Sequence, residues 1–454
     1  MTRHHYFVIV SLLFLIPVSC EKSPKLTVSS KEVIFDAYPD EPQTINISAT
    51  GTWTVRVIPL EDWLTVEPTQ GKGDGMITLT ADENAVFVGR TVQVAVSGED
   101  TQTDTIRVIQ TAGIDIAEEI EDEIFKQYCL EICDHSPQDG KLSLKEVKSQ
   151  KTINIKKMEI TSLVGIEYFT NLENLDCSFN SLKSFDISAN TNLKNLDCSY
   201  NSLESIDISQ NKELLSLNCS YNPIATIDVA ENVKLTELTL YFMELTGIDV
   251  RHNTALRFLG VSYNNLTTLD VQYNKELDGL HCNETHLTNL NISENTKLRS
   301  LYCVNNQLTV LNTGNNPILG VLWCSDNPHI SLNLSQNAEL EELACARNSL
   351  QTLDISKNVK LKRLFCETNQ ITALNFNNNK DVTDLMCNSN NLTGSIELNN
   401  NRKLQRFNFR ENPSLKTIYV WSEFQMLNVN NDDSNTEKEK PFQIDRSSTT
   451  LVPI

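Results

Sequence analysis

The sequence of 454 residues has little of the material from which phosphate-binding loops and metal clusters are built, with only 15 glycines and 7 scattered histidines. Basic side chains are also scarce: 38 Lys and Arg stand against 59 Asp and Glu, which gives a formal net charge of −21. This acidic balance argues against nucleic acid as a partner, because nucleic-acid binding needs a basic surface. A His–carboxylate–nucleophile set and a nucleotide loop are missing as well, so we expect neither an enzyme nor a bound cofactor.

Long apolar runs are confined to the N-terminus. Residues 1–20 carry Arg3 near the start, continue with an apolar run over residues 6–17, and end in small residues before Cys20. This pattern is typical of a secretory signal and is too short to span a membrane. It resembles a bacterial lipoprotein signal, although Pro17 stands where that family usually has Leu. The resemblance implies lipidation of Cys20 and anchoring at the surface of a bacterial outer membrane, and a plain signal peptide is the alternative.

Residues 26–112 contain short segments in which apolar and polar side chains alternate, separated by turn residues such as Gly51 and Pro68. The main segments are residues 33–35, 44–47, 53–57, 76–79, 92–96 and 106–109. This spacing predicts a β-sandwich of immunoglobulin type. Trp53 and Trp63 fall in the apolar phase, so we expect them in the core and not on a sugar-binding surface.

The same region resembles a BACON domain, a carbohydrate-associated module of bacterial surface proteins. The resemblance rests on the phrases at residues 63–66, 68–71, 90–91 and 108–110, together with Asn84. It implies either glycan binding or a role as a spacer.

Residues 113–171 are expected to form a short helical linker and an N-terminal cap, because apolar residues such as Ile116 and Ile120 recur there at helical spacing. The stretch that contains Asp139 and Glu146 matches the second half of an EF-hand calcium loop. His135 and Pro137 occupy the first and third ligand positions, however, and neither supplies a carboxylate. Asp139 and Glu146 are therefore weak metal candidates, and a capped turn between two helices is the favoured interpretation.

A repeat of 21 residues determines the fold of the remaining chain. Its first phrase, residues 172–180, occurs twelve times up to about residue 420, and each repeat contains a second, similar phrase such as residues 182–190. The pattern resembles bacterial leucine-rich repeats of the alternating IRREKO type. One coil cannot bury its apolar side alone, so the coils are expected to stack into a solenoid.

The repeat also predicts what lies inside each coil. Alternate side chains of an extended segment point the same way, so Leu175 and Cys177 are expected inside and Asp176 outside. Most half-repeats end in an Asn, beginning with Asn180 and Asn190. We expect these amides to form two internal ladders that bond to otherwise unpaired backbone groups.

Twelve cysteines in an exported protein would normally suggest disulfides. Nine of them share one repeat position, which Leu240, Val261 and Phe409 fill in other coils. Equivalent residues of adjacent coils lie ~4.8 Å apart, whereas the Cβ atoms of a disulfide lie ~3.8 Å apart. We expect Cys129 and Cys133 to be buried in a helix rather than paired. The nine predicted buried free thiols are Cys177, Cys198, Cys219, Cys282, Cys303, Cys324, Cys345, Cys366 and Cys387.

The central outward residue of the first strand changes character along the solenoid. Its first five occupants, up to Gly260, are small or polar, whereas the next six include three aromatics and a Met. Large apolar side chains on a water-facing sheet indicate a binding face, because the fold does not need them. Coverage by the C-terminal tail or by another subunit is the alternative. The candidate ligand-binding residues are His281, Tyr302, Trp323, Phe365 and Met386.

Two further outward files are expected to be structural. The aromatic residues that stand two positions after the Cys slot in the first five coils, from Phe179 to Tyr263, should stack on one another. A file of carboxylates runs from Asp186 to Asp270 on the opposite half-repeat. Carboxylates ~5 Å apart repel by about 1 kcal/mol in water, which local hydrogen bonds can absorb. A row of bound cations is the alternative.

These features predict a mainly β protein with an immunoglobulin-like sandwich at 26–112, a helical linker and cap at 113–171, a leucine-rich repeat solenoid of about twelve coils at 172–420, and a C-terminal cap or tail at 421–454. The favoured function is an adhesin or receptor, anchored by lipid, that binds an extracellular protein, host proteins included, through the solenoid face. The alternatives are a lipoprotein that binds polysaccharide with the sandwich and the aromatic residues, and a spacer without a ligand.

Overall fold

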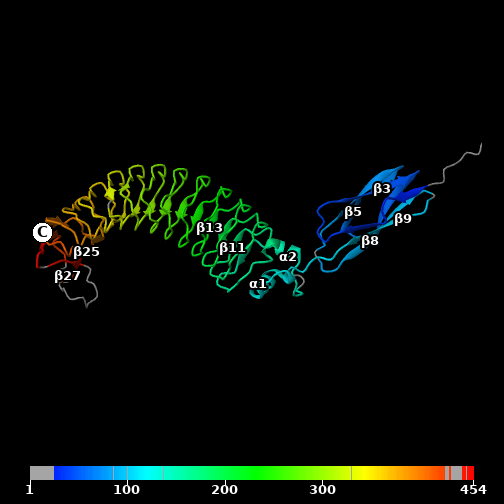
Figure 1. Ribbon diagram of the computed structural model, residues 1–454, viewed down its shortest axis with the longest axis horizontal. Coiled ribbons are helices and arrows are strands. Elements are labelled where there is room, and N and C mark those ends of the chain that lie inside the picture. The colour runs from blue at the N-terminus through cyan, green and yellow to red at the C-terminus, as the bar shows by residue number, and fades with distance from the viewer. Residues whose placement is uncertain are drawn as a thin grey trace, which may run out of the picture. The chain divides into compact units, whose positions relative to one another are not determined.

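The computed structural model describes residues 25–84, 86–99, 101–135, 138–328, 330–424, 429–430, 442–445 and 447–454. The chain divides into two compact units between Asp115 and Ile116 (Figure 1). Residues 1–20, including Cys20, lie outside the described residues, so the signal sequence and the lipid anchor stay predictions. Among the described residues, no helix is long and apolar enough to cross a membrane.

The first unit is a β-sandwich of a four-stranded and a five-stranded sheet. Neighbouring strands are antiparallel except for one parallel pair, β2 and β9. The four-stranded sheet has the order β1 (Leu26–Val28), β3 (Gln43–Ala49), β7 (Gly75–Ala81), β5 (Leu64–Glu67). The five-stranded sheet has the order β2 (Glu32–Phe35), β9 (Asp104–Gln110), β8 (Arg90–Gly98), β4 (Thr52–Ile58), β6 (Gln70–Lys72).

Both tryptophans of the sandwich lie in its core, as predicted. Trp53 is 3% exposed and Trp63 is 7% exposed. The indole nitrogen of Trp53 donates a hydrogen bond of 2.9 Å to the carbonyl of Gly73. A Cβ atom on Gly71 would lie 2.1 Å from the Trp53 ring, so glycine is required where the backbone passes the indole. These rings are structural and do not form a platform for sugar.

The second unit opens with a helical cap, which comprises η1 (Ile116–Glu118), α1 (Glu123–Cys133), α2 (Leu144–Lys148) and η2 (Ile166–Tyr168). Asp122 caps α1 by accepting hydrogen bonds from the backbone N–H groups of Ile124 and Phe125. Phe125 is fully buried, with its ring centroid 6.5 Å from that of Phe169. The helices therefore belong to the solenoid unit as its cap.

The solenoid is built on a parallel sheet that has 15 strands in the described part of the chain. It begins one coil earlier than the repeat predicts, because β10 (Thr152–Asn154) pairs with β11 (Asn174–Asp176) and places Ile153 beside Leu175. The following strands are β12 (Asn195–Asp197), β13 (Ser216–Asn218), β14 (Glu237–Thr239), β15 (Phe258–Gly260), β16 (Gly279–His281), β17 (Ser300–Tyr302), β19 (Val321–Trp323), β21 (Glu342–Ala344), β22 (Arg363–Phe365), β23 (Asp384–Met386) and β25 (Arg406–Asn408).

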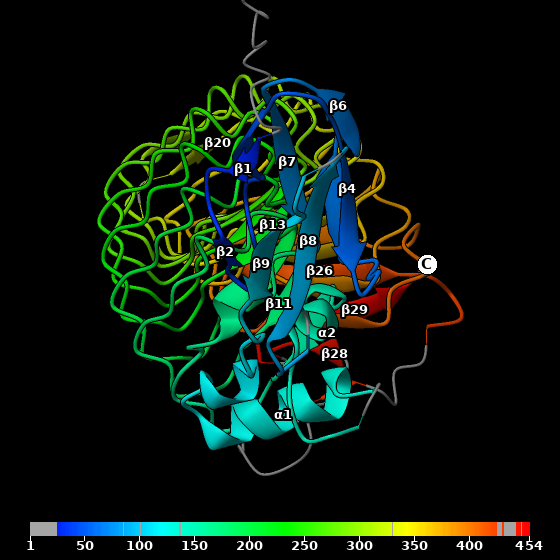
Figure 2. The same ribbon diagram turned by 90° about the vertical axis from the view of Figure 1, so that its right-hand side faces the viewer.

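Each strand is short, and the rest of each coil consists of bends. In Figure 2, β11 and β13 lie on one side of the coils, and the bends of successive coils overlie one another on the other side. Short strand pairs also form among the bends, between β18 (Val310–Leu311) and β20 (Ser331–Leu332), and among β24 (Gly394–Glu397), β26 (Leu415–Val420) and β29 (Thr450–Pro453).

The described part of the C-terminal segment closes the last coil. β28 (Phe442–Gln443) pairs with β25, and β27 (Val429–Asn430) pairs with β28. The Phe442 ring packs 4.9 Å from both Phe407 and Phe424. The segment therefore acts as a cap, which covers the apolar end that an open solenoid would expose to water.

The interior follows the predicted pattern. All nine cysteines of the repeat position are buried and free, as are Cys129 and Cys133. Burial raises the pKa of the Cys282 thiol to about 12, so it stays protonated and unreactive at neutral pH. In the first ladder, the Asn201 amide donates to the carbonyls of Cys177 and Cys198, both at 3.0 Å. The Asn ladders and the buried thiols are thus confirmed.

Candidate functional site

The five candidate residues occupy the C-terminal position of their strands on one face of the long sheet. His281, Tyr302 and Trp323 are neighbours in register on β16, β17 and β19. Ala344 on β21 follows Trp323 and separates it from Phe365, which is in register with Met386. All five candidate side chains are half-buried. The face therefore holds three aromatic residues in contact and, beyond Ala344, a separate pair.

The three neighbouring rings are tilted against one another. The His281 and Tyr302 centroids are 4.4 Å apart with planes at 64°, and those of Tyr302 and Trp323 are 5.1 Å apart with planes at 53°. Tilted rings at these distances attract through their edges and faces. They leave part of each ring face uncovered, and this is surface that a ligand can contact.

Two further residues extend this group, and the sequence analysis missed both. The Tyr241 hydroxyl lies 2.8 Å from Nδ1 of His281. The Phe258 ring lies 4.8 Å from the His281 ring in an edge-on arrangement at 83°. We call Tyr241, Phe258, His281, Tyr302 and Trp323 the aromatic cluster.

A departure from the repeat could have revealed Tyr241. It stands at the position that Ser178, Ser199 and Ser220 occupy in preceding coils. Its ring reaches over Gly260, where an added Cβ would lie 2.6 Å from the Tyr241 ring. Tyr241 and Gly260 therefore both depart from the residues usual at their positions, and the two changes together let Tyr241 reach His281.

Burial favours the neutral forms of two side chains in the cluster, and a hydrogen bond holds a third. Burial lowers the pKa of His281, which favours the neutral ring, and raises the pKa of Tyr241 to about 12. The Trp323 indole donates to Oε1 of Glu342 at 3.1 Å. Glu342 is only 7% exposed and also pairs with Arg363. The cluster is thus held at its C-terminal end by a carboxylate that is paired with Arg363.

The aromatic file at the edge of the sheet is a separate structure. Phe179, Tyr200, Tyr221, Phe242 and Tyr263 stack with centroids 4.0–4.5 Å apart and planes within 17° of parallel. Each has a positive φ of 50–60°, which turns the chain after the strand. The outer face of Phe179 is covered by Lys157, whose Nζ lies 4.8 Å from the ring centroid. The predicted stacking is confirmed.

The carboxylate file forms local turns. Asp186, Asp207, Asp228, Asp249 and Asp270 each accept a hydrogen bond from the backbone N–H two residues later, at 2.8–3.1 Å. This bond is the main cause that lowers the pKa of Asp186 and Asp207. Asp249 also pairs with Arg251, which lowers its pKa to about 2. Each carboxylate is therefore stabilised within its own coil.

The calcium-loop candidates are used within the helical cap. Glu146 and Ser143 form a capping box at the start of α2, with the Ser143 backbone N–H donating to Glu146 at 2.9 Å. Asp139 accepts from the backbone N–H of Lys141 at 3.1 Å. In the residues that the structure describes, no group of three or more His, Cys, Asp or Glu could hold a metal ion. The segment is a capped turn between two helices, as the favoured interpretation has it.

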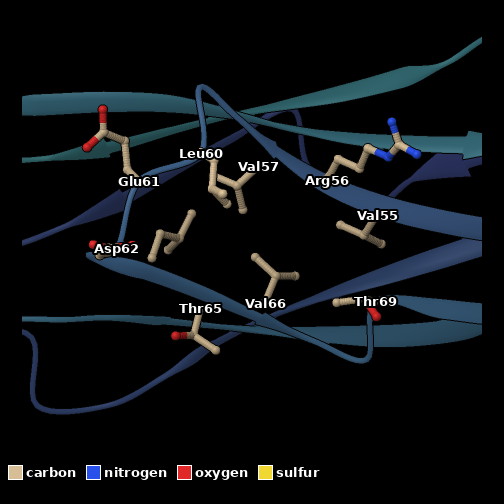
Figure 3. Close-up of a pocket in the computed structure, with 10 residues that line it drawn as sticks. Val55, Arg56, Val57, Leu60, Glu61, Asp62, Thr65, Val66 and Thr69 are labelled. Atoms are coloured by element: carbon tan, nitrogen blue, oxygen red, sulfur yellow. The ribbon is translucent and has the colours of Figure 1, made fainter.

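The sandwich has a groove of its own, with a volume of about 590 Å³. It lies between β4 and β5, and in Figure 3 the side chains of Val57, Leu60 and Val66 point into it. Leu60 is 85% exposed. None of the residues that line this groove is aromatic, so it lacks the flat ring on which a sugar would stack. The groove could not be predicted from the sequence, because it depends on which strands become sheet edges.

The comparisons with known proteins agree with both units. Residues 25–113 match the family described as the viral BACON domain. The chain is similar to the functional domain of InlJ from Listeria monocytogenes, described as including a cysteine ladder, with 27% identity over 68% of this chain and 75% of that one and a TM-score of 0.58. This chain joins a BACON domain to a leucine-rich repeat solenoid.

A second similar structure is the internalin InlF of Listeria monocytogenes, with 20% identity over 65% of this chain and 98% of that one and a TM-score of 0.54, which shows the shared fold. No curated protein sequence matches the chain. The internalin-like solenoid and the BACON domain together fit a binding protein of the cell surface.

Proposed function

We propose that this protein is a lipid-anchored receptor or adhesin that binds an extracellular protein through the sheet face of its leucine-rich repeat solenoid. The aromatic cluster is the observation that carries the proposal. Five half-buried rings meet across the coils on a rigid parallel sheet. Protein interfaces concentrate their binding energy in a few such residues, with Trp and Tyr prominent among them.

The edge stack supports this assignment by contrast. Its rings lie parallel and cover one another's faces, whereas the cluster rings are tilted at 53–83° along the chain of contacts from Phe258 to Trp323. Tyr241 and His281 are nearly parallel, at 14°, but their centroids are 6.3 Å apart, compared with 4.0–4.5 Å in the edge stack. Charged side chains flank the cluster, including the Glu342–Arg363 pair. A polar rim around partly exposed rings is typical of a protein interface.

The anchoring part of the proposal rests on Cys20 and the apolar run before it. Lipidation there would place the solenoid at the surface of an outer membrane. The BACON domain then serves as the module that separates the binding face from the anchor.

The test is to probe arrays of secreted and cell-surface proteins, with polysaccharide arrays in parallel, using residues 21–454. The paired changes Tyr302→Ala and Trp323→Ala should abolish capture of any protein bound by the unaltered chain. Tyr273→Ala is the matched control, because Tyr273 is 47% exposed and lies outside the cluster. Capture of polysaccharides alone, or unchanged protein capture by the paired variant, would contradict the proposal.

A further inference from the structure

A small hollow adjoins the aromatic cluster at the beginning of β16. It has a volume of about 280 Å³ and is lined by Thr236, Glu237, Arg257, Phe258, Asp278, Gly279 and Ser300. We call it the Gly279 hollow. Phe258 belongs both to the hollow and to the cluster, so the two features form one continuous surface.

The hollow exists because one coil has no side chain at this register position. Phe258, Gly279 and Ser300 are neighbours in register at the starts of three successive strands. A Cβ atom on Gly279 would lie 2.9 Å from Cδ2 of Phe258 and 3.2 Å from Oγ of Ser300. Glycine therefore lets the Phe258 ring lie close to the backbone of Gly279, and this ring lines one side of the hollow.

Three carboxylates occupy this register position, and the one beside the hollow differs from the other two in its neighbour. Glu342 and Asp384 each pair with an arginine one coil further on, Arg363 and Arg406 respectively. Glu237 occupies the same position, but its neighbour one coil further on is Phe258. In the described part of the chain, Glu237 makes no ion pair, and its Oε2 accepts only a long hydrogen bond of 3.5 Å from the Ser216 hydroxyl.

A second carboxylate lies at the lip of the hollow. Asp278 pairs with Arg257 at 3.5 Å, and both side chains are substantially exposed. The lining therefore holds two carboxylates and one guanidinium, which leaves an excess of one negative charge next to an aromatic ring. A cation beside an aromatic ring and a carboxylate is attracted by both.

We infer that the Gly279 hollow receives a basic side chain, arginine or lysine, from the protein partner. The cation takes the place beside Glu237 that an arginine of this chain takes beside Glu342 and Asp384. Its aliphatic part lies over Gly279 against Phe258. The inference rests on the proposed function, because it places this side chain at one end of the interface on the aromatic cluster.

The experiment uses a small probe and does not require the partner. N-acetyl-arginine methylamide is titrated against residues 21–454, and its binding is followed by saturation-transfer NMR of the arginine side-chain protons. N-acetyl-glutamate methylamide serves as the probe of opposite charge. We expect transfer to the arginine probe, little transfer to the glutamate probe, and a signal that falls as salt is added.

Two variants test the assigned contacts. Glu237→Gln removes an exposed charge with no change of shape, and Phe258→Leu removes the ring; each should weaken arginine binding by about threefold or more, the range of an exposed charge or cation–π contact. Glu204→Gln is the control, since Glu204 is exposed and lies outside the hollow. Equal transfer in the unaltered chain and both test variants would overturn the inference, as would equal transfer to the two probes.

The outcome separates this inference from the proposed function. In one outcome, capture of a protein depends on Trp323 while binding of the arginine probe depends on neither Glu237 nor Phe258. That result would support the proposed interface and refute the inferred site for a basic side chain. If the probe depends on both residues, the hollow is a cation site whether or not a partner has been captured on the arrays.

Discussion

The second Asn ladder makes a sharp prediction about hydrogen bonding in the core. In this ladder the Asn253 amide donates to the carbonyls of Val229 and Asn232 at 2.8 and 2.9 Å. Its Oδ1 is buried and has no hydrogen-bond donor within reach among the described residues. The same holds for its counterparts in most coils, Asn190, Asn211, Asn232, Asn274, Asn295, Asn316, Asn358, Asn379 and Asn401.

One coil shows how the orphan acceptor can be satisfied. The hydroxyl of Thr313 donates to Oδ1 of Asn337 at 2.7 Å and lies 3.3 Å from the carbonyl of Asn333. Val229 occupies the repeat position of Thr313, and both precede their ladder Asn by 24 residues. Val229→Thr should therefore place a hydroxyl beside Oδ1 of Asn253 with almost no change of volume.

The expected free-energy changes follow from this geometry. A hydroxyl buried in a core without a partner costs about 1–3 kcal/mol, and we expect that cost for the control Val261→Thr, whose slot lies between Leu240 and Cys282. A new hydrogen bond returns about 0.5–1.5 kcal/mol and also satisfies the acceptor. Val229→Thr should therefore stay within about 0.5 kcal/mol of the unaltered chain. The converse change, Thr313→Val, should lose about 1 kcal/mol.

The assay is urea unfolding at 25 °C followed by far-UV circular dichroism, with the slope compared across variants so that midpoints report stability. Hydrogen exchange of the amides around Asn253 and Asn337 adds a local measure. If Val229→Thr costs as much as Val261→Thr, the hydroxyl does not reach the amide oxygen and the reasoning is refuted. Stability unchanged by Thr313→Val would count against it equally.

Three further predictions address the thiols, the cluster and the anchor. Alkylation of the denatured, unreduced protein should label all nine ladder cysteines, and mass spectrometry that finds linked peptides from neighbouring coils would contradict the free-thiol ladder. Because burial lowers the pKa of His281 from 6.5, the unfolded chain binds more protons below that pH, so stability should fall on acidification; this component should vanish in His281→Gln when unfolding is compared at about pH 5.5 and pH 7.5. Cys20→Ser should abolish the processed, membrane-bound form in cell fractionation, and persistent membrane attachment would exclude a lipid anchor at that residue.

The sequence was sufficient for the interior of the solenoid because the repeat fixes every inward position by the same geometry. It did not reveal the coil at β10, since Thr152-Ile153-Asn154 is followed by Ile155 and Met158 where other coils have Cys and Asn. Ile153 still pairs with Leu175, so this coil has the strand pairing of the other coils without their signature residues. A search for signature residues recognises only the coils that retain them.

The site was harder to predict for a different reason. His281, Tyr302 and Trp323 were identified from a single file of outward positions and contact one another, but two further rings of the cluster come from other files. Tyr241 reaches His281 across Gly260 from a position that normally holds a small serine. The repeat spacing predicts which residues are in register. It does not predict which neighbouring file a long side chain such as Tyr241 contacts.

The departures from the repeat around the cluster all bring aromatic rings together on the surface, and packing of the interior does not explain them. Tyr241, Gly260 and Gly279 each replace the usual kind of residue at their position, and the glycines lie where the rings of Tyr241 and Phe258 lean across. None of these changes fills the interior, since Leu238, Leu259 and Leu280 bury the core of the same strands completely. Glycine in a strand weakens it, and at Gly260 and Gly279 it leaves room for the rings of Tyr241 and Phe258. The edge stack, by contrast, repeats one contact from coil to coil and needs no such adjustment. A surface for which neighbouring coils depart from the repeat together is therefore where recognition of a partner is to be sought.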